Sequence, residues 1–290
     1  MAITAEMVKK LREQTGAGMM DCKKALTETD GDYEKAVTLL REKGIAVAAK
    51  RESKSASEGL ITCLITPDMK TGALLEANCE TSFVAKTDEF VELARDLVKQ
   101  VVEGGASTVD ALMEQPYPGG PTVRDRFTEL MGKIGEKLAI TRFDRISTQG
   151  IIGSYVHTGD QIAVLVELSG VSPSDDAKNL AKDIAMHISW SNPDYLRRED
   201  VPQDVIEKER DVHRQWAIKE GKPENIVDRI VDGRMREYYS RACLIEQPFI
   251  KDEDQTIGDL LKAAAAKTGG SPAVARYVRY RVGETSVDGD

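Results

Sequence analysis

Apolar and polar residues follow a helical spacing over the first part of the chain. A first helix is predicted after Thr4, which can cap it, and this helix stops at Gly16. A second helix begins near Gly18, and a third is capped by Asp32 and ends at Gly44. These short helices predict a small bundle, and a bundle of this size buries little surface and is marginal on its own.

An internal repeat follows the bundle. Each copy has an apolar run, a polar turn, a second apolar run and then a helix. An isolated β-hairpin is unstable in water, so the helix is predicted to cover one face of the hairpin. Chance similarity between short apolar runs is the alternative, but the shared helix pattern favours duplication. The matching segments are 59–61 and 150–152, 74–76 and 165–167, and LARDL at 93–97 and LAKDI at 180–184.

A pair of long helices interrupts the second copy. Residues 204–219 carry an apolar seam that includes Val212 and Trp216, and residues 224–240 carry a second seam. The GKP turn at 221–223 is short, so the two helices are predicted to run antiparallel as a hairpin that projects from the core. The alternative is a hairpin that folds flat on its own domain.

These patterns predict an α+β protein with three parts. Residues 1–55 form a three-helix unit and a linker, residues 56–147 the first α+β subdomain, and residues 148–290 the second. The second subdomain holds the helical hairpin at about 201–243, and a final strand is predicted at 274–282. The core therefore consists of two related subdomains, each a β-hairpin with helices.

Charge and cysteine content narrow the class of protein. The chain has 290 residues, of which 40 are basic and 49 acidic, and its formal net charge is −9. Proteins that bind nucleic acid by neutralising phosphates usually have a basic excess, so direct nucleic-acid binding is disfavoured. The cysteines lie far apart with no C-x-x-C pair, which indicates reduced thiols rather than disulfides or a zinc site. With no secretory signal and no apolar stretch of membrane-spanning length, a cytoplasmic location is expected and a membrane partner is not.

Motifs of nucleotide binding and catalysis are missing from the sequence. There is no G-x-x-x-x-G-K-[ST] loop, and the GAG run at 16–18 has Asp21 where a dinucleotide fingerprint has its third glycine. His157, His187 and His213 are too dispersed to suggest a catalytic triad, although folding can bring distant residues together. The sequence thus predicts no cofactor, no metal site and no catalytic residues.

Four short segments resemble one protein family. The segment 15–26 reads TGAGMMDCKKAL and the segment 78–90 reads NCETSFVAKTDEF, with GKIGE at 132–136 and QPF at 247–249 further on. Together they closely resemble the bacterial elongation factor Ts family, whose members are guanine nucleotide exchange factors that remove GDP from elongation factor Tu. The resemblance covers most of the chain and implies a ubiquitin-associated-type fold for the N-terminal helices.

The resemblance also implies a functional loop. Phe83 would enter a pocket of elongation factor Tu near its magnesium and phosphate site, and Thr81, Ser82 and Val84 complete this magnesium-dislocating loop. In the family the loop reads TDFV, whereas Ser82 replaces the aspartate here, so no role of that carboxylate can be assigned. From the residues alone, Phe83 lies on a strand-to-helix turn and either faces a partner or folds back into its own core.

A second contact surface is implied on the N-terminal helices. By resemblance, a group of residues there docks on the GTPase domain of elongation factor Tu. From periodicity alone, methionines at helical spacing are usually core residues, but two adjacent ones cannot both face one interior. The implied docking residues are Leu11, Arg12, Met19, Met20 and Lys23, and further implied partner contacts are Ile134, Gly135 and His157.

Three functions are compatible with these patterns. The first is nucleotide exchange on elongation factor Tu, bound in its GDP-loaded and nucleotide-free forms. The second is an adaptor with a ubiquitin-associated-like domain, which tethers proteins without changing nucleotide affinity. The third is an enzyme with its site at the junction of the repeats, for which no catalytic constellation is recognisable. The resemblance also implies that the helical hairpin can mediate self-association.

Overall fold

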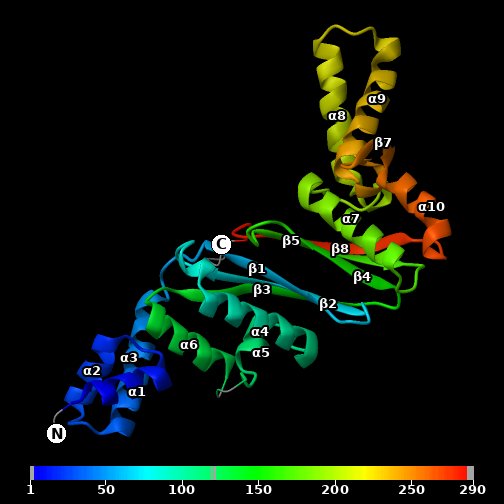
Figure 1. The fold of residues 1–290 in the computed structure, drawn as a ribbon. Coiled ribbons are helices and arrows are strands. Elements are labelled where there is room, and N and C mark those ends of the chain that lie inside the picture. The colour runs from blue at the N-terminus through cyan, green and yellow to red at the C-terminus, as the bar shows by residue number, and fades with distance from the viewer. Residues whose placement is uncertain (1–2, 119, 121, 286–290) are drawn as a thin grey trace.

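The computed structural model describes residues 3–118, 120 and 122–285, which form an elongated body with an arm (Figure 1). A helical bundle lies at one end, two antiparallel sheets with covering helices form the middle, and a helical hairpin extends near the other end (Figure 1). Helices and antiparallel strands occupy separate segments of each subdomain, so the predicted α+β class is confirmed. Among the described residues, none of the helices combines the length and the apolar character that crossing a bilayer requires.

The N-terminal bundle contains α1 (Ala5–Thr15), α2 (Met19–Glu28) and α3 (Tyr33–Arg51). As predicted, the Thr4 hydroxyl caps α1 by accepting a hydrogen bond from the Met7 N–H at 3.2 Å, and Gly16 ends this helix in the left-handed conformation. The side chains buried in the bundle are Val8, Leu11, Cys22, Ala25, Leu26 and Ala36.

The sequence predicts that the third helix ends at Gly44, but α3 continues to Arg51. Gly44 faces Gly132 of α6 (Val123–Ile134), and a Cβ atom added to Gly132 would lie 2.6 Å from the Cα of Gly44. The two glycines therefore let α3 and α6 cross at close range, which explains a glycine inside α3 rather than at its end. Because the linker after the bundle is helical as far as Arg51, α3 itself joins the bundle to the core.

Two three-stranded antiparallel sheets form the core, one with the order β1-β2-β3 and the other with the order β4-β5-β8. Their strands are β1 (Glu58–Ile65), β2 (Thr71–Cys79), β3 (Leu138–Ser147), β4 (Ile151–Val156), β5 (Ile162–Ser169) and β8 (Ala273–Arg281). The sequence patterns predict both hairpins and the last strand but not β3, because charged residues interrupt the apolar positions of β3.

The two sheets repeat one another in detail. Glu76 on the central strand β2 pairs with Arg142 on β3, and Glu167 on the central strand β5 pairs with Arg276 on β8. In both sheets the register shifts directly after the glutamate, which marks a β-bulge at equivalent positions. These equivalent pairs support the duplication inferred from the apolar runs.

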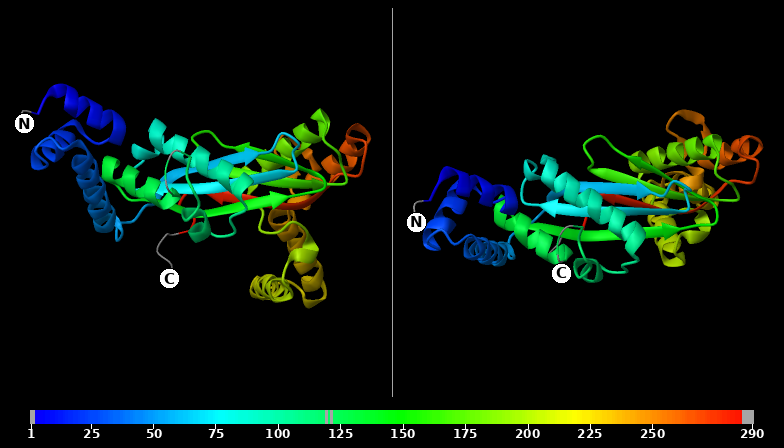
Figure 2. Two further views of the ribbon diagram at one scale, coloured as in Figure 1. Left: turned by 90° about the horizontal axis from the view of Figure 1, so that it is seen from below. Right: turned by 60° about the horizontal axis from the view of Figure 1, so that its bottom comes forward.

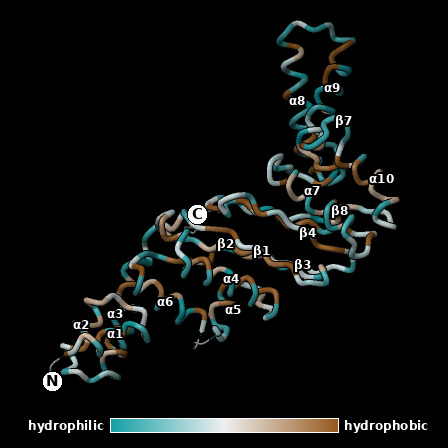
Figure 3. The backbone as a smooth tube through the Cα atoms, viewed as in Figure 1, coloured by the Kyte–Doolittle hydropathy of each residue, from teal (hydrophilic) through white to brown (hydrophobic). Residues whose placement is uncertain are grey.

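The sheets pack against each other, and helices cover their outer faces (Figure 2). The first sheet is covered by α4 (Asp88–Gly104) and the second by α7 (Asp175–Ser191). The strands are largely apolar, whereas the arm is mostly hydrophilic (Figure 3). The layer between the sheets contains Ile61, Leu74, Ile146, Ile152, Ala163, Leu165 and Tyr280. The remaining elements are α5 (Val109–Met113), β6 (Pro248–Phe249), β7 (Asp252–Thr256) and α10 (Ile257–Thr268), with 3-10 turns at Val84–Lys86, Arg198–Asp200 and Leu244–Glu246.

The arm consists of α8 (Gln203–Lys219) and α9 (Glu224–Ala242), which pack together and project away from the core (Figure 1). Its seam places the small side chain of Ala217 beside the apolar residues of α9. Val212 and Trp216 are exposed instead, so the prediction that they line the seam is wrong. The Trp216 ring lies under the guanidinium of Arg234, 5.2 Å from ring centroid to Cζ, on the surface of the arm.

His187 is a buried histidine that links α7 to the segment around β6. The Ile250 N–H donates to its Nδ1 at 3.3 Å, so Nε2 carries the proton and donates to the Gln247 side chain at 2.9 Å. Burial lowers the pKa of His187, although the hydrogen bond with Gln247 acts in the opposite direction. The folded chain therefore holds this ring in its neutral form.

We expect the free energy of unfolding to decrease as the pH falls below about 6.5, the usual pKa of histidine. The unfolded chain binds a proton there that the folded chain excludes, so the contribution of His187 is present above this pH and is lost below it. Thermal melts between about pH 7.5 and 5 measure this loss. Carboxylates that titrate in the same range are present in both wild type and the His187→Gln variant, so their effect cancels in the comparison. In His187→Gln the stability should depend less on pH than it does in wild type. Parallel curves for the two proteins would contradict the assignment.

Candidate partner-binding surface

The loop after β2, residues 81–84, presents an aromatic side chain to solvent. Phe83 is 84% exposed, whereas the next two residues, Val84 and Ala85, are buried in the core of the first subdomain. This buried pair anchors the start of the 3-10 turn that leads into α4, so Phe83 points outward. The alternative in which Phe83 folds back into its own core is therefore wrong.

Hydrogen bonds at both ends of the loop fix its backbone. The Thr87 hydroxyl donates to the carbonyl of Val84 at 2.8 Å, and the Cys79 thiol donates to the carbonyl of Thr81 at 3.1 Å. Burial, together with the nearby Glu136 carboxylate, raises the pKa of Cys79 to about 12, so the thiol keeps its proton and remains a donor. Ser82 is exposed beside Phe83 and offers a hydroxyl without charge.

Ile134 and Gly135 lie close to this loop. Gly135 ends α6 in the left-handed conformation, with a φ of 80°, and Ile134 before it is partly exposed. The carboxylate of the next residue, Glu136, accepts hydrogen bonds from the Thr81 N–H at 3.0 Å and from the Thr81 hydroxyl at 2.8 Å. The structure thus brings the end of α6 beside the loop, although 55 residues separate Thr81 from Glu136.

His157 lies on the turn between β4 and β5 and is exposed, with its Nδ1 atom 3.2 Å from the Tyr155 hydroxyl. The Gln161 side chain of the same turn donates to the carbonyl of Gly59 in β1 at 2.9 Å. The start of β1 pairs with the end of β2, so the turn lies at the same end of the core as Phe83. Two segments from different subdomains therefore lie at the same end of the core.

The exposed face of the N-terminal bundle lies on α2 and the neighbouring end of α1. Met20 is 64% and Met19 48% exposed, and Lys23 and Arg12 are exposed as well. The alternative that places the methionines in the core is wrong, because three other residues of α2 fill the interior. Leu11 needs a correction, since it is fully buried among the three helices and is a packing residue rather than an exposed contact.

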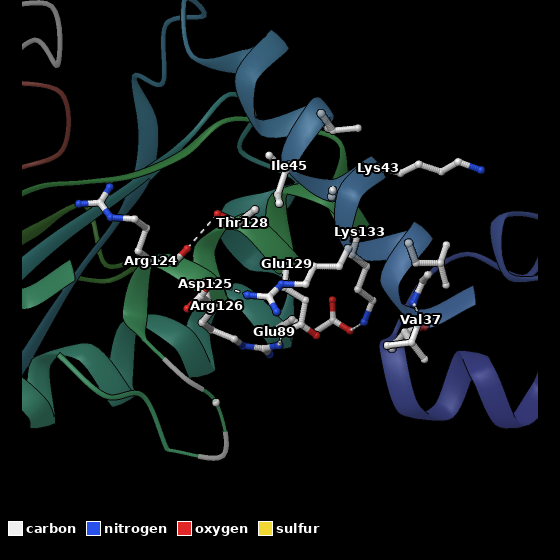
Figure 4. Close-up of a pocket in the computed structure, with 18 of the residues that line it drawn as sticks. Val37, Lys43, Ile45, Glu89, Arg124, Asp125, Arg126, Thr128, Glu129 and Lys133 are labelled. Carbon is white, nitrogen blue, oxygen red and sulfur yellow. Dashed lines mark hydrogen bonds and ion pairs between the residues drawn. The ribbon is translucent and has the colours of Figure 1, made fainter. Parts of the chain in front are cut away.

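A groove separates the bundle from the core (Figure 4). Ion pairs cross it or line its walls: Arg41 of α3 lies 3.1 Å from Asp125 of α6, and Lys133 of α6 pairs with Glu89 of α4. Such pairs between neighbouring elements suit a junction between two parts of the chain better than a catalytic centre. Over the ranges that the structure describes, no three His, Cys, Asp or Glu side chains are placed to hold a metal ion.

The sequence patterns assign no role to Glu80 and Glu136, which the structure places at this surface. Glu80 accepts a hydrogen bond from the Lys137 N–H at 2.7 Å, and Glu136 binds Thr81. Both glutamates lie within segments that the sequence singles out, Glu80 in 78–90 and Glu136 in 132–136, and this position is the one signal available without a structure. The pairing itself depends on tertiary contacts.

Comparisons with known proteins agree on one family. The family model described as elongation factor TS matches residues 80–284. A protein of Clostridium perfringens (strain SM101 / Type A) named elongation factor Ts is 45% identical over 283 residues, which cover 97% of this chain and 93% of that protein. A protein of Clostridium novyi (strain NT) with the same name is 46% identical over 285 residues, with the same coverage. The similarity extends over the bundle and both subdomains.

Proposed function

The chain belongs to the elongation factor Ts family, and we propose that it binds elongation factor Tu and promotes the release of GDP, so that GTP can bind. The observation that carries this proposal is the exposed Phe83, which is followed by two residues buried in the core, Val84 and Ala85. On this proposal the chain is a nucleotide exchange factor of the cytoplasm, which acts by binding a protein and does not itself transform a substrate.

Exchange by a protein that holds no nucleotide follows from thermodynamic linkage. A nucleotide bound with nanomolar affinity is held by about 12 kcal/mol and therefore leaves slowly. A factor that binds the nucleotide-free partner more tightly than the loaded partner weakens nucleotide binding by the same ratio. Such a factor needs a broad docking surface and a group that fits only the distorted nucleotide site.

The exposed residues of the chain can supply both parts. We assign docking to the α2 face of the bundle and displacement to Phe83, which enters the pocket near the magnesium ion and the phosphates. Ser82 carries no charge, so the loop acts through shape and apolar contact rather than through a carboxylate beside the metal. Additional contacts are assigned to Ile134, Gly135 and His157 at the same end of the core.

Release of labelled GDP from purified elongation factor Tu tests the proposal. A saturating amount of the chain should raise the release rate by at least about tenfold, which corresponds to 1.4 kcal/mol. The adaptor alternative predicts complex formation with no change in this rate. Calorimetry should detect no tight binding of GDP to the chain alone. A release rate that stays at its spontaneous value in a formed complex would contradict the proposal.

Met20→Ala and Lys23→Ala should weaken complex formation with little effect on the melting temperature, because both side chains are exposed in the free chain. Each substitution should weaken the binding free energy by about 1–2 kcal/mol, which raises Kd roughly 5- to 30-fold. Binding isotherms and thermal melts measure the two quantities. Leu11→Ala is the control, since it opens a cavity in the bundle and should lower the melting temperature and binding together. If the Met20 variant behaved like the Leu11 variant, the docking assignment would be wrong.

A further inference from the structure

Two glutamates hold the Phe83 loop against the end of α6 in a reciprocal arrangement. Glu136 accepts a hydrogen bond from the N–H of Thr81, the residue that follows Glu80, at 3.0 Å. Glu80 accepts one from the N–H of Lys137, the residue that follows Glu136, at 2.7 Å. The Thr81 hydroxyl adds a third hydrogen bond to Glu136 at 2.8 Å. We call this set of four residues the glutamate brace.

The brace also connects to the N-terminal bundle. The guanidinium of Arg51, the last residue of α3, lies 3.1 Å from the second carboxylate oxygen of Glu80. The Lys137 ammonium donates to the carbonyl of Glu52 at 2.8 Å. One cluster of charge-assisted hydrogen bonds therefore joins the end of α3, the end of α6 and the Phe83 loop. Such hydrogen bonds are stronger than neutral ones.

We infer that Glu136 is a positioning residue that holds Phe83 in the orientation needed for nucleotide release. This inference rests on the proposed function of Phe83. The last paired residue of β2 is Cys79, so the backbone between Cys79 and the buried Val84 has no strand partner. The bonds of Thr81 to Glu136 fix this interval before the partner arrives, and preorganisation lowers the entropy lost when the complex forms.

Loss of the Glu136 carboxylate should loosen the loop without unfolding the subdomain, because Val84 and Ala85 stay buried in its core. Hydrogen–deuterium exchange of the free chain measures this directly. In Glu136→Ala the peptide that spans 79–87 should exchange at least about tenfold faster, whereas peptides from β5 should not change. Glu136→Gln keeps one acceptor oxygen and the side-chain volume, so its exchange should lie between that of wild type and Glu136→Ala.

GDP release at increasing concentrations of the chain separates positioning from docking. Glu136→Ala should lower the maximal release rate by about 5- to 10-fold and change the half-saturating concentration by less than about twofold. Glu103→Ala is the matched control, because it removes the same charge from an exposed site at the opposite end of α4. In a chain that already carries Phe83→Ala, Glu136→Ala should cause no further loss, since the group that it positions is gone.

The outcomes distinguish this inference from the function on which it rests. If Phe83→Ala slows release but Glu136→Ala does not, positioning by Glu136 is refuted and the exchange function stands. Equal losses from Glu136→Ala with and without Phe83 would also refute it, because Glu136 would then act by another route. If Phe83→Ala leaves the catalysed release rate unchanged, the displacement role of Phe83 and its positioning by Glu136 both fail, whereas exchange itself fails only if the wild-type chain does not raise the rate. Should Glu136→Ala lower the melting temperature, Glu136→Gln carries the same kinetic test.

Discussion

Replacing Phe83 with alanine should slow catalysed GDP release from elongation factor Tu by at least about tenfold and leave the fold intact. An aromatic anchor in an interface contributes about 2–4 kcal/mol when truncated, and 1.4 kcal/mol is a factor of ten. Phe83 is 84% exposed in the free chain, so its removal should hardly change the melting temperature. The loss should fall on the release step more than on docking, because the α2 face of the bundle remains.

Trp190→Ala provides a control for the loss of an exposed aromatic side chain. Trp190 lies near the end of α7 in the second subdomain and is 82% exposed, much as Phe83 is in the first. It has no assigned role, so the release rate of this variant should stay within about twofold of wild type. Phe83→Leu should lie between Phe83→Ala and wild type, since leucine keeps part of the apolar volume. If Phe83→Ala and Trp190→Ala lowered the release rate equally, the effect could not be assigned to the position of Phe83 in its loop.

Features of the fold that depend on neighbours in sequence could be predicted. The cap at Thr4 and the helix end at Gly16 follow from side chains and backbone conformations within one turn. The duplicated hairpins follow from apolar runs with a fixed order, and in both hairpins the two predicted strands pair antiparallel. Interactions between residues close in the sequence determine these features, so they can be predicted from the sequence alone.

Features that depend on distant partners could not be predicted in the same way. Gly44 looks like a helix end, but its role is set by Gly132, which lies far along the chain on another helix. The exposure of Phe83 was an open alternative, because only the burial of the next two residues decides which way the ring points. The role of Glu136 likewise requires Thr81 to be beside it. Tertiary packing overrides local pattern at each of these positions.

The largest effect on stability is expected at the buried ion pair of Glu76 and Arg142. Arg142 Nε donates to the fully buried Glu76 carboxylate at 2.8 Å, and its guanidinium lies 3.9 Å from the centroid of the Tyr280 ring in the other sheet. Glu76 also accepts from the Gly283 N–H at 2.9 Å, so the pair joins both sheets. Arg142→Met leaves a buried carboxylate without its cation and should lower the free energy of unfolding by about 3–5 kcal/mol. Denaturation by urea measures this loss.

The duplication supplies a matched control for this prediction. Arg276 makes the equivalent pair with Glu167, Nε to carboxylate 2.6 Å, but its side chain is 52% exposed. Arg276→Met should therefore lower the free energy of unfolding by about 1 kcal/mol or less, because solvent screens an exposed pair. Adding Glu76→Met to Arg142→Met should recover part of the larger loss, since it removes the unpaired charge. Equal losses for the two arginine variants would mean that cross-strand contact, and not burial between the sheets, sets the contribution of the pair.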